Sequence, residues 1–173
     1  MSEHFSATRN PVPEKKRSGR AIPRKLQIFL ELEQNTLKFE KSVDSPTPIR
    51  KFLANPKIPQ DFELLMEVTI RGGEKWKSVG FDFDNHDGRA LGFYISAVQG
   101  GAKTQFLQRD GADTEYLTNG VVSYPFQQGE KVRIRFLIKG PLANVYINGT
   151  LLQALQFKPA RVSGALQLWT FDC

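Results

Sequence analysis

Apolar and polar residues alternate along much of the chain after Lys25. The clearest case is segment 131–139, whose apolar positions, separated by Arg133 and Arg135, are Val132, Ile134, Phe136 and Ile138. A period of two predicts a β-strand with one buried face. Asn148-Gly149 follows shortly afterwards, and both central residues of a type I′ turn must accept positive φ. This dipeptide therefore predicts a tight hairpin between residues 144–147 and 150–152.

The same pattern predicts further strands and no convincing helix. Alternation or β-rich composition marks segments 26–32, 37–39, 62–70, 79–83, 91–97, 104–108 and 165–171. Four prolines interrupt residues 42–60, so we expect a long connection there with one short edge strand at 49–53. Residues 109–129 are expected to be irregular. About ten to twelve short strands predict an all-β, antiparallel sandwich or barrel.

The positive charge is concentrated at the N-terminus. The 173 residues carry a net charge of +6, but residues 1–25 hold seven Lys and Arg against two Glu. Such a Pro- and charge-rich segment buries too little surface to fold. We expect a basic disordered tail at 1–24, either a solvated linker or a contact for polyanions, and a β-sandwich domain at 25–173. The folded part is nearly neutral, so nucleic acid is not an expected partner.

Composition excludes several kinds of site. Cys173 is the single cysteine, which rules out a disulfide framework, a Cys-based zinc site and a Cys-x-x-Cys-His haem attachment. The sequence contains no run of 18 apolar residues, so no transmembrane helix is expected. The N-terminus lacks the apolar run of a signal peptide, so localisation is not indicated by the chain itself.

Several segments of the sequence resemble a known family. They are Asp61-Phe62-Glu63-Leu64, Val79-Gly80-Phe81-Asp82-Phe83-Asp84, Asn144-Val145-Tyr146-Ile147-Asn148-Gly149 and Leu166-Gln167-Leu168-Trp169-Thr170-Phe171-Asp172. Over residues 26–172 the chain resembles a laminin-G-like, concanavalin A-like jelly roll. More narrowly, it is similar to modules of large planctomycete proteins that also carry cytochrome c-type domains.

The resemblance implies a concanavalin-like jelly roll that holds a glycan or a protein partner. It also implies a parent protein made for the periplasm or cell surface, although this chain carries no haem-attachment motif. In such modules a further strand follows the Trp169-Thr170-Phe171-Asp172 phrase. We therefore expect a domain that lacks its last strand and exposes a sheet edge there.

The segment Asp82–Gly88 is the sharpest cluster of polar residues, and three interpretations stay open. Asp82, Asp84 and Asp87, with Asn85, offer oxygen ligands for calcium, although their spacing is not that of an EF-hand. The Asp-x-Asp-x-x-Asp spacing copies the carboxylate pattern of jelly-roll endoglucanases. The third interpretation places Asp82 and Asp84 on a solvent-exposed strand face and treats Asn85-His86-Asp87-Gly88 as a turn.

A second candidate site is a surface. If the phenylalanines point to the core, aromatic and polar side chains share the opposite faces of their strands: Trp76, Tyr94, Arg133, Arg135, Asn144 and Tyr146. Rings that stack on sugar C–H groups, with polar groups that fix hydroxyls, are typical of glycan sites. The alternative is an ordinary sheet face, exposed or covered by segments 42–60 and 110–128.

Other motifs have ordinary explanations. Asn148-Gly149-Thr150 matches the N-glycosylation sequon, but the hairpin accounts for it. His86 has no neighbouring nucleophile, and Trp169 is expected to pack on a sheet. The sequence therefore favours a non-catalytic recognition module that binds carbohydrate on a sheet face. A structural docking module without a ligand is the alternative, and a glycoside hydrolase is the third.

Overall fold

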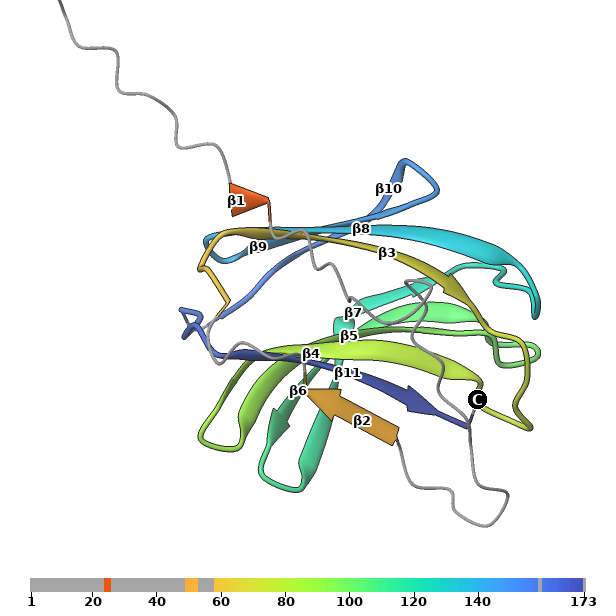
Figure 1. Ribbon diagram of the computed structural model, residues 1–173, viewed down its shortest axis with the longest axis horizontal. Helices are drawn as coiled ribbons and strands as arrows, with labels where there is room; N and C mark the ends of the chain where they lie inside the picture. The colour runs from red at the N-terminus through yellow and green to blue at the C-terminus, as the bar shows by residue number, and fades with distance from the viewer. Residues whose placement is uncertain (1–23, 26–48, 53–57, 159, 173) are drawn as a thin grey trace, which may run out of the picture.

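Two β-sheets packed face to face form the protein, as Figure 1 shows for the computed structural model. The structure describes residues 24–25, 49–52, 58–158 and 160–172, with side chains from residue 58 onward. These residues form strands β1 (Arg24–Lys25), β2 (Ile49–Phe52), β3 (Phe62–Thr69), β4 (Ser78–His86), β5 (Arg89–Ser96), β6 (Lys103–Asp110), β7 (Asp113–Ser123), β8 (Lys131–Lys139), β9 (Leu142–Ile147), β10 (Thr150–Gln156) and β11 (Ala165–Phe171). The described residues contain no helix, and hence none long and apolar enough to cross a membrane.

The strand order separates the layers. The five-stranded sheet runs β1-β3-β8-β9-β10, and the six-stranded sheet runs β2-β11-β4-β5-β6-β7. Every pairing is antiparallel except the two-residue contact of β1 with β3. In Figure 1 the five-stranded sheet lies above the six-stranded sheet. An antiparallel sandwich of this kind agrees with the fold class that the alternation predicts.

Alternation in β8 gives the inner face of the five-stranded sheet. Its apolar side chains are buried, whereas Arg133 and Arg135 between them are exposed. Phenylalanines from both sheets lie in the core together with aliphatic residues, and six of them are fully buried: Phe62, Phe81, Phe83, Phe93, Phe106 and Phe136. The ring of Phe136 lies 4.8 Å from that of Phe81 and 5.3 Å from that of Phe83. Edge-on aromatic contacts of this kind join the two sheets.

The Asn148-Gly149 hairpin forms as predicted. Asn148 has φ 50° and Gly149 has φ 88°, as a type I′ turn requires. Asn148 also fixes the turn to β8: its Oδ1 accepts a 2.9 Å bond from the Arg133 backbone N–H, and its own N–H donates to the Arg133 carbonyl at 2.8 Å. The amide oxygen of the sequon asparagine thus has a structural role in this turn.

Other strand predictions met different outcomes. The short edge strand at 49–53 is confirmed as β2, at one edge of the six-stranded sheet. The irregular stretch expected at 109–129 is wrong, because it contains the eleven-residue strand β7. The exposed edge expected at the last strand is also wrong, since β11 pairs with β2 on one side and β4 on the other. The strands expected at 26–32 and 37–39, and most of the tail, lie outside the described residues.

Candidate functional site

The strand register divides the predicted glycan-binding residues between the two outer faces of the sandwich. Tyr94 lies on β5 of the six-stranded sheet, and Trp76 precedes β4 of the same sheet. The other four lie on adjacent strands of the five-stranded sheet: Arg133, Arg135, Asn144 and Tyr146. The expected single surface is therefore wrong. Alternation shows which residues point away from the core, but it does not show which sheet a strand joins.

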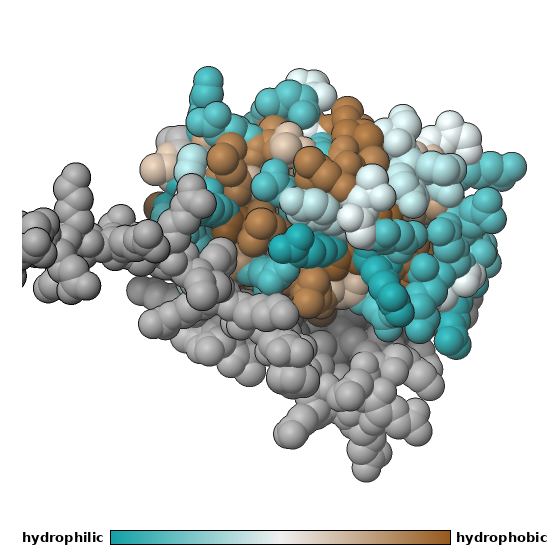
Figure 2. Space-filling model, turned by 90° about the horizontal axis from the view of Figure 1, so that it is seen from above, coloured by the Kyte–Doolittle hydropathy of each residue, from teal (hydrophilic) through white to brown (hydrophobic). Residues whose placement is uncertain are grey.

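The outer face of the five-stranded sheet carries ion pairs and leucines. Arg133 Nε donates to Glu67 at 2.9 Å, and Arg135 pairs with Glu63 while lying 4.9 Å over the Tyr146 ring. The bond from Arg133 lowers the pKa of Glu67. Three exposed leucines share this face, which we call the leucine face: Leu65, Leu142 and Leu151. Figure 2, seen from above Figure 1, shows hydrophobic residues among hydrophilic ones on this side.

The outer face of the six-stranded sheet carries three neighbouring aromatic rings. Tyr94 lies between the other two, with its centroid 5.8 Å from Trp169 and 6.2 Å from Tyr116. The strand register places these residues on β11, β5 and β7, on the side away from the phenylalanine core. Trp169 is only 4% exposed, whereas Tyr116 is 56% exposed. We call this surface the aromatic face, and Tyr116 is its accessible ring.

Two glycines allow these side chains to lie close against the sheet. A Cβ on Gly80 would come within 2.5 Å of Trp169 Cζ2 and 2.7 Å of Tyr94 Cβ. A Cβ on Gly92 would come within 2.7 Å of Asp82 Oδ1 and 2.6 Å of Leu107 Cδ1. Glycine inside a strand often marks such a close approach. Gly80 and Gly92 therefore provide the space in which Trp169 and Asp82 rest.

Asp82 connects the Trp169 end of the aromatic face to β6. Its carboxylate is completely buried: Oδ1 accepts from Trp169 Nε1 at 2.8 Å, and Oδ2 accepts from Arg109 Nε at 2.8 Å. Arg109 also lies 5.5 Å over the Trp169 ring and donates to Thr114 Oγ1 at 2.8 Å. A buried carboxylate needs such compensating bonds. These contacts hold Arg109 and the indole in a fixed arrangement.

Gln105 organises the other end of the aromatic face. Its Oε1 accepts from Lys103 Nζ at 2.8 Å and from the Tyr94 hydroxyl at 3.2 Å, while Nε2 donates to the Leu117 carbonyl at 3.3 Å. Gln105 is 5% exposed. Burial, with a smaller contribution from Tyr116, raises the pKa of Tyr94 to about 12. Tyr94 is therefore a neutral hydrogen-bond donor at ordinary pH.

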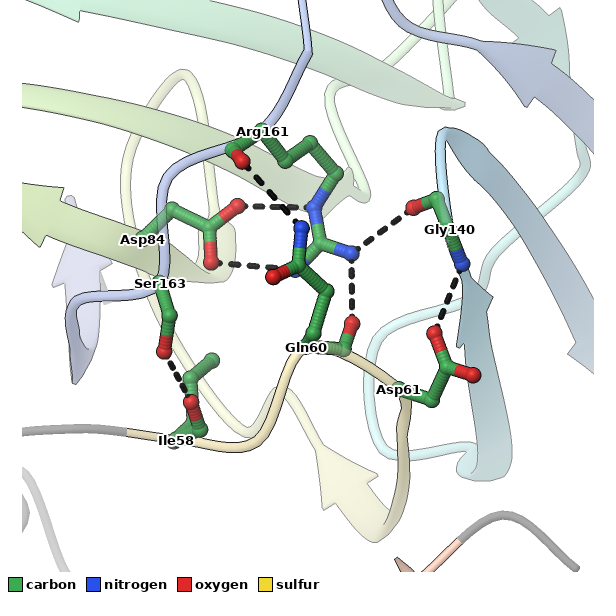
Figure 3. Close-up of polar contacts among 7 residues, drawn as sticks. All are labelled: Ile58, Gln60, Asp61, Asp84, Gly140, Arg161 and Ser163. Atoms are coloured by element: carbon green, nitrogen blue, oxygen red, sulfur yellow. Dashed lines mark hydrogen bonds and ion pairs between the residues drawn. The ribbon is translucent and has the colours of Figure 1, made fainter. Parts of the chain in front are cut away.

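Asp84 belongs to a different cluster, at one end of the sandwich. Arg161 donates two hydrogen bonds to its carboxylate, Nε to Oδ2 at 2.7 Å and Nη2 to Oδ1 at 3.0 Å (Figure 3). Arg161 Nη1 also donates to the carbonyls of Gln60 at 2.7 Å and Gly140 at 2.9 Å. Burial raises the pKa of Asp84, and the bonds from Arg161 oppose that shift. The cluster links the segment after β10 to both sheets, so its evident role is structural.

The three acidic residues predicted as calcium ligands are not brought together. Asp82 contacts Trp169 on the aromatic face, whereas Asp84 contacts Arg161, whose guanidinium lies 5.6 Å from the core ring of Phe83. Asp84 has φ 56°, and the β4–β5 register shifts after Phe83, which breaks the regular alternation. Asp87 lies exposed in the turn beside His86.

No group of three His, Cys, Asp or Glu side chains suited to a metal occurs among the described residues. The carboxylate grouping expected at Asp82, Asp84 and Asp87, for calcium or for glycoside hydrolysis, is therefore wrong in its geometry. The third interpretation is also wrong for Asp82 and Asp84, since both are buried. It holds for the turn, where Asp87 and Gly88 have φ 49° and 78°. Calcium binding elsewhere in the chain stays untested.

Sequence reasoning missed most of the aromatic face. Five of its residues were not predicted as site residues: Gln105, Leu107, Arg109, Tyr116 and Trp169. Tyr116 lies in the stretch expected to be irregular, and Trp169 was predicted only to pack on a sheet. Gly80 and Gly92 are the one local signal, because glycines at the centre of two apolar strands indicate that something packs closely over them.

Solved structures with this fold provide the comparison. No protein-family model and no curated protein matches the chain. The carbohydrate-binding module CBM66 from Bacillus subtilis is 13% identical, with a TM-score of 0.63 over 74% of this chain and 76% of that one. The galectin LEC-6 of Caenorhabditis elegans is 13% identical, with a TM-score of 0.53 over 73% and 84%. Galectin-Ib of Xenopus laevis is 13% identical, with a TM-score of 0.52 over 72% and 92%.

This chain is an all-β jelly-roll sandwich. At such identities the likeness shows the fold alone, and it confirms the fold class predicted from the sequence. The narrower resemblance to laminin-G-like modules of planctomycete proteins is not reached by these comparisons and stays a prediction.

Proposed function

We propose that the protein is a non-catalytic carbohydrate-binding module and that its sugar lies on the aromatic face. The observation that carries this proposal is the exposed ring of Tyr116 beside a buried, hydrogen-bonded polar framework around Asp82 and Gln105. The fold is that of a carbohydrate-binding module and of galectins, which supports the same class of ligand.

The chemistry of the face suits a saccharide. A pyranose ring presents C–H groups that pack against an aromatic ring and hydroxyls that need directed donors and acceptors. Tyr116 offers the ring, while the guanidinium of Arg109 and the ammonium of Lys103 offer donors on either side of Tyr94. Because internal bonds already orient these groups, binding orders few side chains and loses little conformational entropy.

Glycoside hydrolysis is a weaker proposal for this chain. It needs two carboxyl groups flanking one scissile bond. Asp82 and Asp84 are instead paired with different arginines, Arg109 and Arg161. Hydrolysis of a glucan that Asp82→Asn abolishes, in a variant that remains folded, would favour the enzyme.

A docking module without a ligand is the second candidate function. The leucine face supports it, because Leu65 and Leu151 are exposed in one cross-strand row with Arg135 and Tyr146. Exposed apolar side chains gathered on one face favour contact with another protein surface. In this case a neighbouring domain, rather than a sugar, would cover that face.

We also propose that the module belongs to, or derives from, a larger multidomain protein of the periplasm or cell surface. The resemblance to laminin-G-like modules is the support for this proposal. The reading frame around the coding sequence tests it: neighbouring domains in the same frame would agree, and stop codons on both sides would contradict it.

A polysaccharide and glycan-array screen of the full chain tests the function. We expect retention by at least one glycan and loss of that retention in Tyr116→Ala. Binding that Tyr116→Ala keeps but Leu65→Asp removes would place the ligand on the leucine face. Failure to bind any glycan, together with stable association of a purified neighbouring domain, would favour the docking alternative.

A further inference from the structure

Among the described residues, Lys103 gives one end of the aromatic face a positive charge that no ion pair compensates. Its Nζ donates to the neutral amide oxygen of Gln105 at 2.8 Å and lies 6.0 Å from the Tyr94 ring centroid. No ion pair of the described residues includes Lys103. An ammonium has three donors, and the bond to Gln105 uses one of them.

The acidic group of this face is already occupied. Asp82 is wholly buried, and its two oxygens receive Arg109 and Trp169. Asp82 and Arg109 thus neutralise each other at the Trp169 end, 2.8 Å apart. Among the described residues, the charge of Lys103 therefore has no carboxylate partner on the aromatic face.

The backbone of a second aromatic residue, Trp76, borders the same end. Ser96 pairs with Lys103 in the sheet, and its hydroxyl donates to the carbonyl of Trp76 at 2.5 Å. Trp76 is 46% exposed, and Lys75 Nζ lies 4.8 Å from its ring centroid. The loop that borders the Lys103 end of the aromatic face therefore carries an exposed ring and a second ammonium.

The loop of Trp76 is fixed by Asp172. The carboxylate of Asp172 accepts backbone N–H bonds from Lys75 at 2.6 Å, Trp76 at 2.7 Å and Glu74 at 3.3 Å. Asp172 is thereby directed to the backbone, and Glu74 is the other acidic residue of the loop. Lys75, Lys77 and Lys103 carry positive charge here, so cations outnumber acids among the described residues of this end.

We propose that the aromatic face selects acidic saccharides, whose carboxylate or sulfate group binds Lys103 between Tyr94 and Trp76. This inference rests on the proposed function and specifies its ligand class. An anionic group supplies the counter-charge that Lys103 lacks, and charge-assisted hydrogen bonds are stronger than those to a neutral hydroxyl. The neighbouring sugar ring then reaches Tyr116, which lies beside Tyr94.

The test uses pairs of ligands with the same sugar backbone, one with anionic groups and one without. Isothermal titration of the full chain compares trigalacturonate with its methyl ester, and dextran sulfate oligomers with dextran of equal length. We expect the acidic member of at least one pair to bind at least about tenfold more tightly, the scale of one charged hydrogen bond. The carboxylate and sulfate pairs distinguish the two anionic groups.

Lys103→Gln is the decisive variant, and Lys139→Gln, an exposed lysine of the other sheet, is the matched control. Both variants keep the basic N-terminal residues, so non-specific attraction of polyanions affects them equally. We expect Lys103→Gln to remove the preference and Lys139→Gln to keep it.

Equal binding of the charged and neutral members, or equal effects of the two variants, would overturn the acidic-saccharide inference while leaving glycan binding intact. Failure to bind any acidic or neutral saccharide would instead contradict the proposed function itself.

Discussion

The indole N–H of Trp169 donates to the buried carboxylate of Asp82 at 2.8 Å, across neighbouring strands β11 and β4. These residues are 87 positions apart in the sequence. Arg109 completes the arrangement by binding the second oxygen of Asp82 and lying over the indole. The pair fixes one end of the surface to which we assign sugar binding. Substitutions at this pair therefore test that surface through protein stability and the environment of the indole.

Asp82→Asn should destabilise the fold strongly. The substitution leaves Arg109 without its ion partner and presents an amide N–H₂ to one of two donors. Removing one member of a buried pair typically destabilises by about 3 kcal/mol or more. Urea unfolding followed by tryptophan fluorescence measures this change. Asp87→Asn, in the exposed turn, should leave the free energy of unfolding nearly unchanged, and equal effects of the two substitutions would contradict the assignment.

Gly80→Ala should displace Trp169. The added methyl group would come within 2.5 Å of the indole and 2.7 Å of the Phe93 carbonyl. Overpacking of this kind destabilises by about 1–3 kcal/mol, and near-ultraviolet circular dichroism should show a changed tryptophan environment. Gly72→Ala is the matched control, since nothing lies within 4 Å of its Cβ. An unchanged tryptophan spectrum in Gly80→Ala would show that the indole does not rest there.

Arg161→Lys should destabilise the protein without altering the sugar site. Lysine cannot reproduce the two-pronged bond to Asp84 together with bonds to two carbonyls. Because lysine keeps the charge but leaves buried acceptors unsatisfied, we expect a loss of about 1–3 kcal/mol in denaturant unfolding. Arg133→Lys, in an exposed pair on the leucine face, should have a much smaller effect. A change in glycan affinity of folded Arg161→Lys would contradict the separation of the two clusters.

Tyr94 should make stability fall at alkaline pH. Its pKa in the folded protein is about 12, against an ordinary value of 10.0. The unfolded chain therefore loses the phenolic proton first, so this contribution to stability is complete below pH 10 and disappears as pH rises toward 12. Urea unfolding between pH 9 and 11 should show a shallower decline in Tyr94→Phe than in the wild type. A decline as steep in Tyr94→Phe as in the wild type would contradict this role.

The strands were predictable because alternation and turn chemistry are local. Val132 to Ile138 identifies its own buried face, and Asn148-Gly149 identifies its own turn. β7 was missed because most of its side chains are exposed and its register against β6 shifts between Gln105 and Leu107. A strand with little buried surface carries no period-two signal.

The site was harder to predict because its contacts are distant in sequence. Carboxylates are expected in solvent unless they are paired, and nothing near Asp82 or Asp84 indicates that Arg109 and Arg161 reach them. Tyr94 and Tyr146 each lie between two apolar core residues in the sequence, so their local patterns are alike. The strand order nevertheless places them on opposite sides of the sandwich. The sequence therefore indicates which kinds of residue form a site, but not which of them lie together in the fold.

Sugar affinity of two matched tyrosine variants tests the central claim most directly. Tyr116 belongs to the aromatic face and Tyr146 to the opposite face, and both rings are accessible enough for substitution without disturbing the core. The measurement is isothermal titration with the glycan selected by the array. Tyr116→Ala should weaken binding at least about tenfold, the scale of one stacking contact and its neighbours. Tyr146→Ala should bind as the wild type does. Loss of binding in Tyr146→Ala with full binding in Tyr116→Ala would contradict the account.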